Sequence, residues 1–226
     1  MNFKILNELD RILKSNPSLI SNKSKLCHVV NGVFNIELDS LIGDSIHDIS
    51  REIDSAVLSK YFSTVWQPET KKFKYSGLAI IDEVNAMNPG AVIDIGCGYN
   101  EFKGKIQNLI GIDPYNHRAD VNASVLTYSS DKKYDVAICL GSINFGSSEK
   151  IIAEMTAAVN LVNTDGYLYF RVNPGRQHAA PESKWINFYD WDPVFISNVA
   201  NYLNCEVVTL RQDRGDRFYF VLQKNG

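Results

Sequence analysis

From residue 76 to the end of the chain, short apolar runs alternate with stretches in which apolar residues recur at helical spacing. Apolar runs rich in β-branched residues and bounded by turn residues are typical of buried strands. We predict such strands at 91–95, 109–113, 134–140 and 167–172, with a shorter one at 119–122. Helical spacing predicts helices at 76–87, 148–162 and 193–203. This alternation of strands and helices is typical of a parallel sheet.

The chain ends in a different pattern. Two apolar stretches, 205–211 and 217–223, are separated by Asp213-Arg214-Gly215-Asp216, which has the residue types of a tight turn. Such a turn joins antiparallel strands. We therefore predict an α/β fold, with a Rossmann-like, mostly parallel sheet that finishes in an antiparallel C-terminal hairpin.

The first 74 residues are mainly helical in pattern, with stripes at 3–13 and 46–62. Residues 25–38 fit two structures. Asn31-Gly32 between two apolar stretches is a hairpin signal, while the apolar positions on either side of it fit a helix equally well. We favour the hairpin. The chain is thus predicted to contain a mainly helical N-terminal extension at 1–74 and the α/β domain at 75–226.

The connections between the first three predicted strands are short. Only 99–108 and 114–118 are available for them, whereas a parallel crossover that includes a helix needs roughly 10–12 residues or more. The usual crossover helices are expected to be reduced to a turn or missing, which would expose apolar sheet surface. We expect the N-terminal extension to cover this surface. The alternative is a partner subunit, as in a homo-oligomer.

Composition limits the class of protein. Of 226 residues, 45% are apolar and 22% charged, which is ordinary for a soluble globular protein, and the net charge of −3 gives no global attraction to a polyanion. The four cysteines form no metal-binding or redox spacing and fit a reducing compartment. We see no signal-peptide pattern and no apolar run near ~18 residues. We therefore expect a cytoplasmic protein without a membrane span or a metal site.

The strand at 91–95 runs into the turn Gly96-Cys97-Gly98. A Gly-x-Gly turn lets a ligand approach the backbone because no Cβ is in the way, and ligands of open α/β sheets bind at that edge. A dinucleotide fingerprint would place a third glycine where Glu101 stands, and a negative charge there repels a pyrophosphate. The stretch instead resembles the first motif of class I S-adenosylmethionine-dependent methyltransferases, in a compact form with shortened crossovers. A tight turn without a ligand is the remaining alternative.

The resemblance implies a set of cofactor-binding residues. Asp94 would lie near the methionine part of S-adenosylmethionine, and Gly96, Cys97 and Gly98 would pass under the cofactor. Asp113, at the end of the second strand, would accept both ribose hydroxyls, as an acid does in dinucleotide enzymes, although a turn residue before a proline is its ordinary structural role. The remaining members of the set follow later strands: Asn122 beside the adenine, and Leu140 and Gly141 between cofactor and acceptor.

Candidate residues for the reaction lie in two later loops. Methyl transfer from a sulfonium requires alignment of the acceptor and in some cases a base. We identify three candidates for this catalytic role: His178, Asn144 and Asn173. Three further residues are candidates for binding the acceptor: Ser142, Arg171 and Arg176. For the histidine and the arginines, an ordinary surface or structural role is the alternative.

The resemblance therefore implies methyl transfer from S-adenosylmethionine to an acceptor that is a small molecule, a nucleic acid or a protein. A non-catalytic domain that keeps the fold for binding or assembly is the second hypothesis. A nicotinamide-dependent oxidoreductase is the third, and both Glu101 and the terminal hairpin argue against it.

Overall fold

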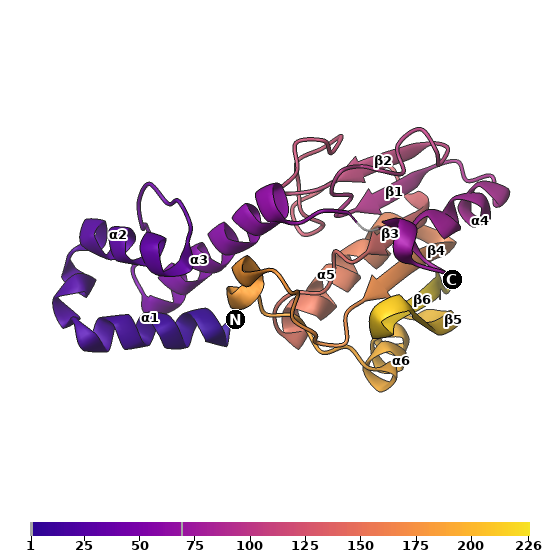
Figure 1. Ribbon diagram of the computed structural model, residues 1–226. Helices are drawn as coiled ribbons and strands as arrows, with labels where there is room; N and C mark the ends of the chain where they lie inside the picture. Colours follow the sequence, from indigo (N-terminus) through magenta and orange to yellow (C-terminus); the bar gives the residue numbers. More distant parts are fainter. Residues whose placement is uncertain (1, 69) are drawn as a thin grey trace. The chain divides into compact units, whose positions relative to one another are not determined.

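The computed structural model describes residues 2–68 and 70–226 and divides the chain into two compact units (Figure 1). The first unit consists of Met1–Trp66 together with Gln177–Asn187. The second consists of Gln67–Arg176 and Phe188–Gly226 and contains the sheet. The sequence predicted that the extension would end at residue 74. The division into an N-terminal extension and an α/β domain at this residue stays a prediction.

The first unit is built from helices α1 (Phe3–Ser15), α2 (Lys23–Phe34) and α3 (Ile46–Lys60). The α1 helix begins at Asn2, whose side chain accepts hydrogen bonds from two backbone N–H groups of the first turn. The α3 helix begins with a capping box between Ser45 and Asp48. Each of the three helices buries one apolar stripe, as expected for amphipathic helices.

The predicted hairpin at 25–38 is wrong, because these residues form most of α2 and the loop after it. Leu26, Val30 and Phe34 share one face of α2 and are buried. The Asn31 side chain does not form a turn. It donates to the Leu38 carbonyl at 2.9 Å and accepts from the Leu38 N–H at 3.0 Å, and so holds the loop against the helix.

Residues 177–187 belong to the first unit, although the chain reaches them only after strand β4 (Val162–Val172). The amide nitrogen of Asn2 donates to the Trp185 carbonyl at 2.7 Å. Lys4 Nζ donates to the Ile186 carbonyl at 2.9 Å. The Trp185 ring lies 4.8 Å from that of Phe34. These contacts make a loop distant in sequence part of the N-terminal helical unit.

The second unit contains a six-stranded sheet in the order β2-β1-β3-β4-β6-β5. Strands β2, β1, β3 and β4 are parallel, and β6 runs antiparallel to both β4 and β5. This confirms the predicted mixed sheet with a terminal hairpin. The other strand bounds are β1 (Val92–Ile95), β2 (Leu109–Ile112), β3 (Tyr134–Leu140), β5 (Cys205–Asp213) and β6 (Arg217–Lys224).

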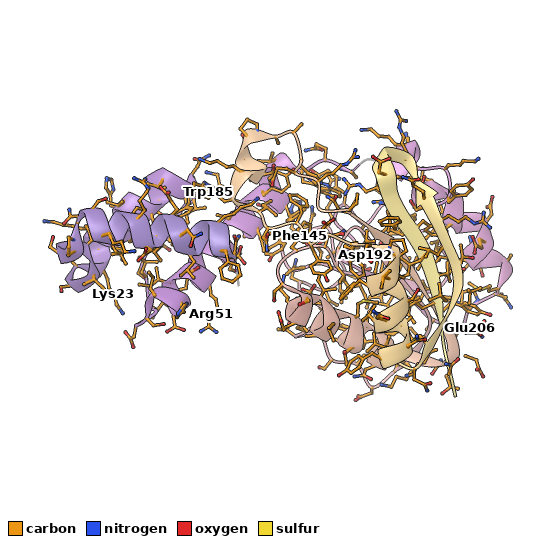
Figure 2. The ribbon with its side chains drawn as sticks, turned by 90° about the horizontal axis from the view of Figure 1, so that it is seen from below. Lys23, Arg51, Phe145, Trp185, Asp192 and Glu206 are labelled. Atoms are coloured by element: carbon orange, nitrogen blue, oxygen red, sulfur yellow. The ribbon has the colours of Figure 1, made fainter. Side chains whose placement is uncertain are left out.

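Side-chain alternation divides the core of this unit into two clusters. On one face of the sheet, Ile93, Ala137 and Phe170 pack with helices α5 (Ser148–Leu161) and α6 (Pro193–Tyr202). Figure 2 labels Asp192, whose carboxylate caps the first turn of α6. The other face carries Val92, and its cluster includes the short helix α4 (Ile80–Ala86).

The crossover between β1 and β2 has no helix, as predicted. Its residues Phe102 and Ile106 are buried in the same cluster as Val92 and α4. The apolar surface left by the missing helix is therefore covered from within the second unit. A cover supplied by residues 1–74 stays a prediction.

The strand predicted at 119–122 is wrong. Residue Val121 forms a single isolated parallel bridge with Ile112 of β2. The Asp120 carboxylate accepts from the Gly111 N–H at 2.8 Å and from Lys103 Nζ at 2.9 Å, while the backbone N–H of Asp120 donates to the Gly111 carbonyl at 2.9 Å. A side chain and a short backbone segment thus satisfy the edge of β2 that a full strand would otherwise pair with.

Candidate functional site

The glycine turn after β1 lies against the end of β2. The N–H groups of Gly96 and Cys97 both donate to the Ile112 carbonyl, at 2.8 and 3.0 Å. Gly96 has φ +70° and Gly98 has φ +53°, values that favour glycine. A Cβ on Gly111 of β2 would lie 2.6 Å from the Asn100 amide oxygen and 2.8 Å from the Cys97 sulfur. The turn therefore needs a glycine on the neighbouring strand, a requirement that the sequence analysis missed.

Gly96 also approaches the loop that follows β3. A Cβ added to it would lie only 2.2 Å from the Cβ of Ser142. The Ser142 hydroxyl is buried with no hydrogen-bond partner among the described residues. The same holds for the amide oxygen of Asn100, which follows the glycine turn. Two polar atoms at this edge therefore lack the bonds that buried groups normally make.

Asp113 joins the two loops at this edge. Its carboxylate accepts from the Gly98 N–H at 2.9 Å and from the N–H groups of Tyr115 and Asn116 at 2.8 and 2.9 Å. The side chain is 7% exposed. Asp113 therefore has the structural role of a turn residue in its own loop. Its contact with Gly98 also places it beside the glycine turn, as the ribose hypothesis requires. Binding of a ribose stays a prediction.

Asp94 is a buried carboxyl group at the end of β1, 3% exposed. Burial raises the pKa of Asp94 to about 8, the Asp113 carboxylate adds to this effect, and the guanidinium of Arg171 opposes it. The free protein therefore holds Asp94 mainly protonated at neutral pH. A cation brought next to it would favour its ionised form.

The other expected cofactor residues lie around the same edge. The Asn122 amide nitrogen donates to the Asn116 carbonyl at 2.9 Å, which holds this loop beside Asp113. Burial raises the pKa of the Cys97 thiol, with Asp94 as a further cause, so this thiol stays neutral. Leu140 ends β3, and Gly141 follows it with φ +100°.

Asn144 and Asn173, the expected catalytic amides, are both buried and hold loops together. The Asn144 amide oxygen accepts from the Asn173 N–H at 2.7 Å. The Asn173 side chain bonds the backbone of Arg176 twice, through its amide nitrogen and its oxygen. These contacts are structural, and a catalytic role for either amide stays a prediction.

Two of the expected acceptor or catalytic residues have partners elsewhere. Arg176 forms an ion pair with Asp216 at the surface. His178 belongs to the first compact unit, where its Nδ1 lies 2.8 Å from the hydroxyl of Tyr61. The structure thus does not assemble all six catalytic and acceptor candidates in one unit with Asp94. Their predicted roles stay untested.

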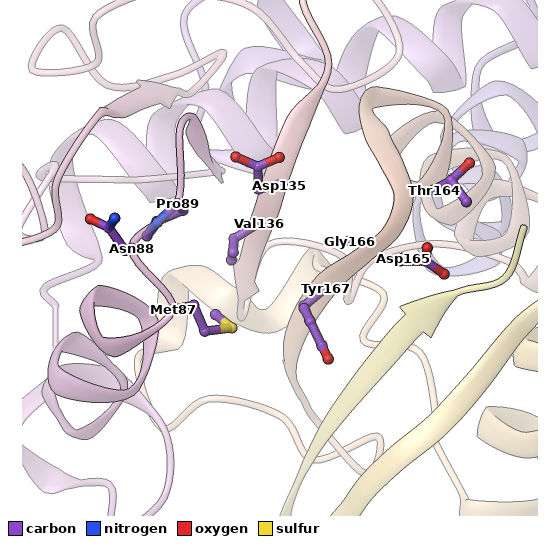
Figure 3. A pocket seen from close by; sticks show the side chains of 9 residues that line it. All are labelled: Met87, Asn88, Pro89, Asp135, Val136, Thr164, Asp165, Gly166 and Tyr167. Carbon is purple, nitrogen blue, oxygen red and sulfur yellow. The ribbon is translucent and has the colours of Figure 1, made fainter.

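A cavity of about 450 Å³ lies at the other end of the sheet, around the amino ends of β3 and β4 (Figure 3). Its carboxylate Asp135 accepts from the N–H groups of Gly90 and Ala91 and from the Asn163 side chain. These bonds anchor the start of β1, so we assign Asp135 a structural role. Ligands of open α/β sheets bind at the opposite, carboxyl edge.

Within residues 2–68 and 70–226, no group of three or more His, Cys, Asp or Glu side chains is arranged to hold a metal ion. No helix in this part of the chain is long and apolar enough to cross a bilayer.

Comparison with solved structures identifies proteins that share the fold. The first is 1,6-didemethyltoxoflavin-N1-methyltransferase from Burkholderia thailandensis, with a TM-score of 0.59 and 15% identity over 84% of this chain and 94% of that one. The second is magnesium protoporphyrin IX methyltransferase from Synechocystis, with a TM-score of 0.55 and 13% identity over 76% of this chain and 97% of that one. The third is the N-methyltransferase NodS from Bradyrhizobium japonicum, with a TM-score of 0.50 and 14% identity over 65% of this chain and 84% of that one.

The first and third of these structures contain S-adenosylhomocysteine, and the second contains S-adenosylmethionine. No protein-family model matches the chain, and no curated protein matches it significantly in sequence. The chain therefore has the fold of class I S-adenosylmethionine-dependent methyltransferases, which confirms the predicted resemblance at the level of the fold.

Proposed function

We propose that the chain binds S-adenosylmethionine at the carboxyl edge of β1, β2 and β3 and transfers its methyl group to a small-molecule acceptor. The observation that carries the proposal is the joined pair of loops at this edge, in which Gly98 donates to Asp113 beside the buried Asp94. The chain passes from β1 to β2 on one side and returns to β3 on the other. Such a change of direction creates the crevice in which doubly wound folds bind ligands.

The residues present fit this cofactor. Asp94 is a carboxyl group with a raised pKa that a cationic ammonium group would ionise. The buried Ser142 hydroxyl and Asn100 oxygen provide hydrogen-bonding atoms without protein partners among the described residues. The proposal assigns the ribose to Asp113, which accepts from Gly98, and the adenine to Asn122, whose side chain holds the loop beside Asp113. Fold neighbours that hold this cofactor or its product support the same proposal.

When bound, S-adenosylmethionine supplies a methyl group on sulfur to a nucleophile aligned with the carbon–sulfur bond. The chain would contribute binding and alignment: Asp94 would release its proton to solvent and hold the ammonium group, and the turn at Gly96 and Gly98 would fix the cofactor's approach. A small-molecule acceptor is supported by two fold neighbours whose names specify didemethyltoxoflavin and magnesium protoporphyrin IX.

The second candidate is a fold that binds the cofactor without transferring the methyl group. It is favoured by Asn144 and Asn173, whose side chains hydrogen-bond the protein's own backbone. A screen with radiolabelled methyl donor over small-molecule, nucleic-acid and protein pools separates the two. Label in a product supports transfer, whereas tight cofactor binding with no labelled product in any pool supports a binding role.

We expect Asp113→Ala to weaken binding of S-adenosylhomocysteine by about 1–3 kcal/mol, the scale of losing hydrogen bonds to a charged group. The measurement is calorimetric titration, with NAD as a competing ligand and Asp131→Ala, an exposed acid in another loop, as the matched control.

Asp113 also holds Gly98, so its loss has a structural part as well. Titration with adenosine and 2′,3′-dideoxyadenosine separates the two parts, because only adenosine carries the ribose hydroxyls. The variant should lose affinity for adenosine and not for the dideoxy compound. Equal losses for both ligands would contradict the ribose assignment.

A further inference from the structure

Asp94, Leu140 and Arg171 lie on the same face of the sheet, near its carboxyl edge. Val92, two residues before Asp94, belongs to the cluster that includes Leu140, and so does Tyr169, two residues before Arg171. Side chains two residues apart on a strand share a face. In the strand register Asp94 pairs with Ile138, two residues before Leu140, and Leu140 pairs with Arg171. A carboxyl group on β1 and a guanidinium on β4 are therefore placed on one face of the sheet, on either side of β3.

The guanidinium of Arg171 is held in a defined position. Its Nη2 donates to the Leu140 carbonyl at 2.9 Å, and its Nη1 donates to the Ser76 hydroxyl at 3.4 Å. The ring of Phe73 lies 3.8 Å from the guanidinium carbon and covers it. A Cβ on Gly141, which follows Leu140, would lie 3.4 Å from Nη2, so the guanidinium also lies close to this backbone turn.

Asp213 at the end of β5 fixes the segment that carries these contacts. Its carboxylate accepts from the N–H groups of Lys74, Tyr75 and Ser76 and from the Ser76 hydroxyl. Residues 73–76 are thereby tied across the carboxyl edge. Asp213 thus acts through Ser76 as a positioning residue for Arg171.

The guanidinium is close enough to Asp94 to lower the pKa of that carboxyl group against the effect of burial. Once Asp94 is ionised, the two groups carry opposite charges, and an α-amino acid carries the complementary pair, an ammonium and a carboxylate. Arginine binds carboxylates through parallel N–H donors. The methionine part of the proposed cofactor is an α-amino acid, which makes it the chemical match for this pair.

We propose that Arg171 binds the α-carboxylate of the methionine part of the cofactor while Asp94 holds its ammonium group. The inference rests on the proposed function and assigns Arg171 to the cofactor, where the sequence analysis expected it on the acceptor side. The strap at 73–76, held by Asp213, keeps the guanidinium in place for this contact.

The test compares two ligands that differ in the amino-acid group. S-adenosylhomocysteine carries it, and 5′-deoxy-5′-methylthioadenosine has the same adenosine and sulfur without it. Calorimetric titration of Arg171→Met should show an affinity for S-adenosylhomocysteine lowered roughly 10- to 100-fold, the scale of hydrogen bonds to a charged group. Its affinity for methylthioadenosine should be unchanged. Arg211→Met is the matched control, since Arg211 is exposed on β5 beside Tyr75.

The outcomes separate this inference from the function on which it rests. Equally lowered affinities for both ligands would show that Arg171 acts only through the fold. Weakened methyl transfer with unchanged affinity for both ligands would return Arg171 to the acceptor side. Either result overturns the inference and leaves the proposed function standing. If the wild-type chain binds neither ligand, both fail. If the Met variant does not fold, Arg171→Lys, which keeps the charge, replaces it, and its affinities for the two ligands are compared in the same way.

Discussion

The free energy of unfolding of the ligand-free protein is expected to fall as pH rises from about 5 to 8, and Asp94→Asn should remove much of this fall. Asp94 has a pKa of about 8 in the folded state, against about 4 in an unfolded chain. Between these values the folded state binds more protons than the unfolded state, so stability decreases as pH increases. The slope from this one group is at most about 1.4 kcal/mol per pH unit.

The measurement is urea unfolding of the wild-type and Asp94→Asn proteins at pH 5.5, 6.5 and 7.5, in the absence of ligand. Other titrating groups contribute equally to both proteins, so the difference between the two curves isolates Asp94. The variant should gain stability relative to wild type as pH rises. Asp131→Asn, at an exposed position, should run parallel to wild type. Parallel curves for Asp94→Asn as well would show that this carboxyl group is not protonated in the folded state.

Replacing Gly96 with alanine is expected to lower the free energy of unfolding by about 2–5 kcal/mol. Positive φ costs an L-residue about 1–2 kcal/mol, and an atom forced into a packed site costs about 1–3 kcal/mol more. The new Cβ would lie 2.2 Å from the Cβ of Ser142, and its φ would be +70°. The turn and the loop after β3 would have to separate.

Gly104→Ala provides a matched control, because Gly104 has φ +75° and nothing within 4 Å of an added Cβ. It should lose only the conformational part, about 1–2 kcal/mol. Ser142→Gly removes the atom that meets the new Cβ, so Gly96→Ala combined with Ser142→Gly should recover most of the difference between the two alanine variants. If Gly96→Ala is no worse than Gly104→Ala, the close approach of turn and loop is contradicted.

Local patterns were sufficient to predict the sheet and the position of the glycine turn. The apolar runs of β1 and β3 and the turn at 213–216 each depend on residues adjacent in sequence. The hairpin prediction failed because Asn31-Gly32 is only a local signal. The Asn31 side chain hydrogen-bonds the backbone of Leu38, and the apolar stripe of α2 determines the structure. At the edge of β2, the Asp120 side chain and the backbone of residues 120–121 supply the hydrogen bonds that a full strand would make.

The candidate site was predictable where it follows a strand and unpredictable where it depends on long-range contacts. Asp94 and Gly96 are recognisable from their place after an apolar run. The contact of Asp213 with Ser76 joins residues 137 positions apart and gives no local signal. The same is true of the segment 177–187, which Asn2 and Lys4 hold in the first unit.

The central claim is that the amino-acid end of an S-adenosyl cofactor is bound at Asp94. Calorimetric titration with S-adenosylhomocysteine at pH 6.5, in two buffers of different ionisation enthalpy, counts the protons released on binding. At this pH Asp94 is protonated in the free protein, and the ligand's ammonium group would ionise it. The account predicts release of close to one proton by the wild type and none by Asp94→Asn. No binding heat, or the same proton count for both proteins, would contradict it.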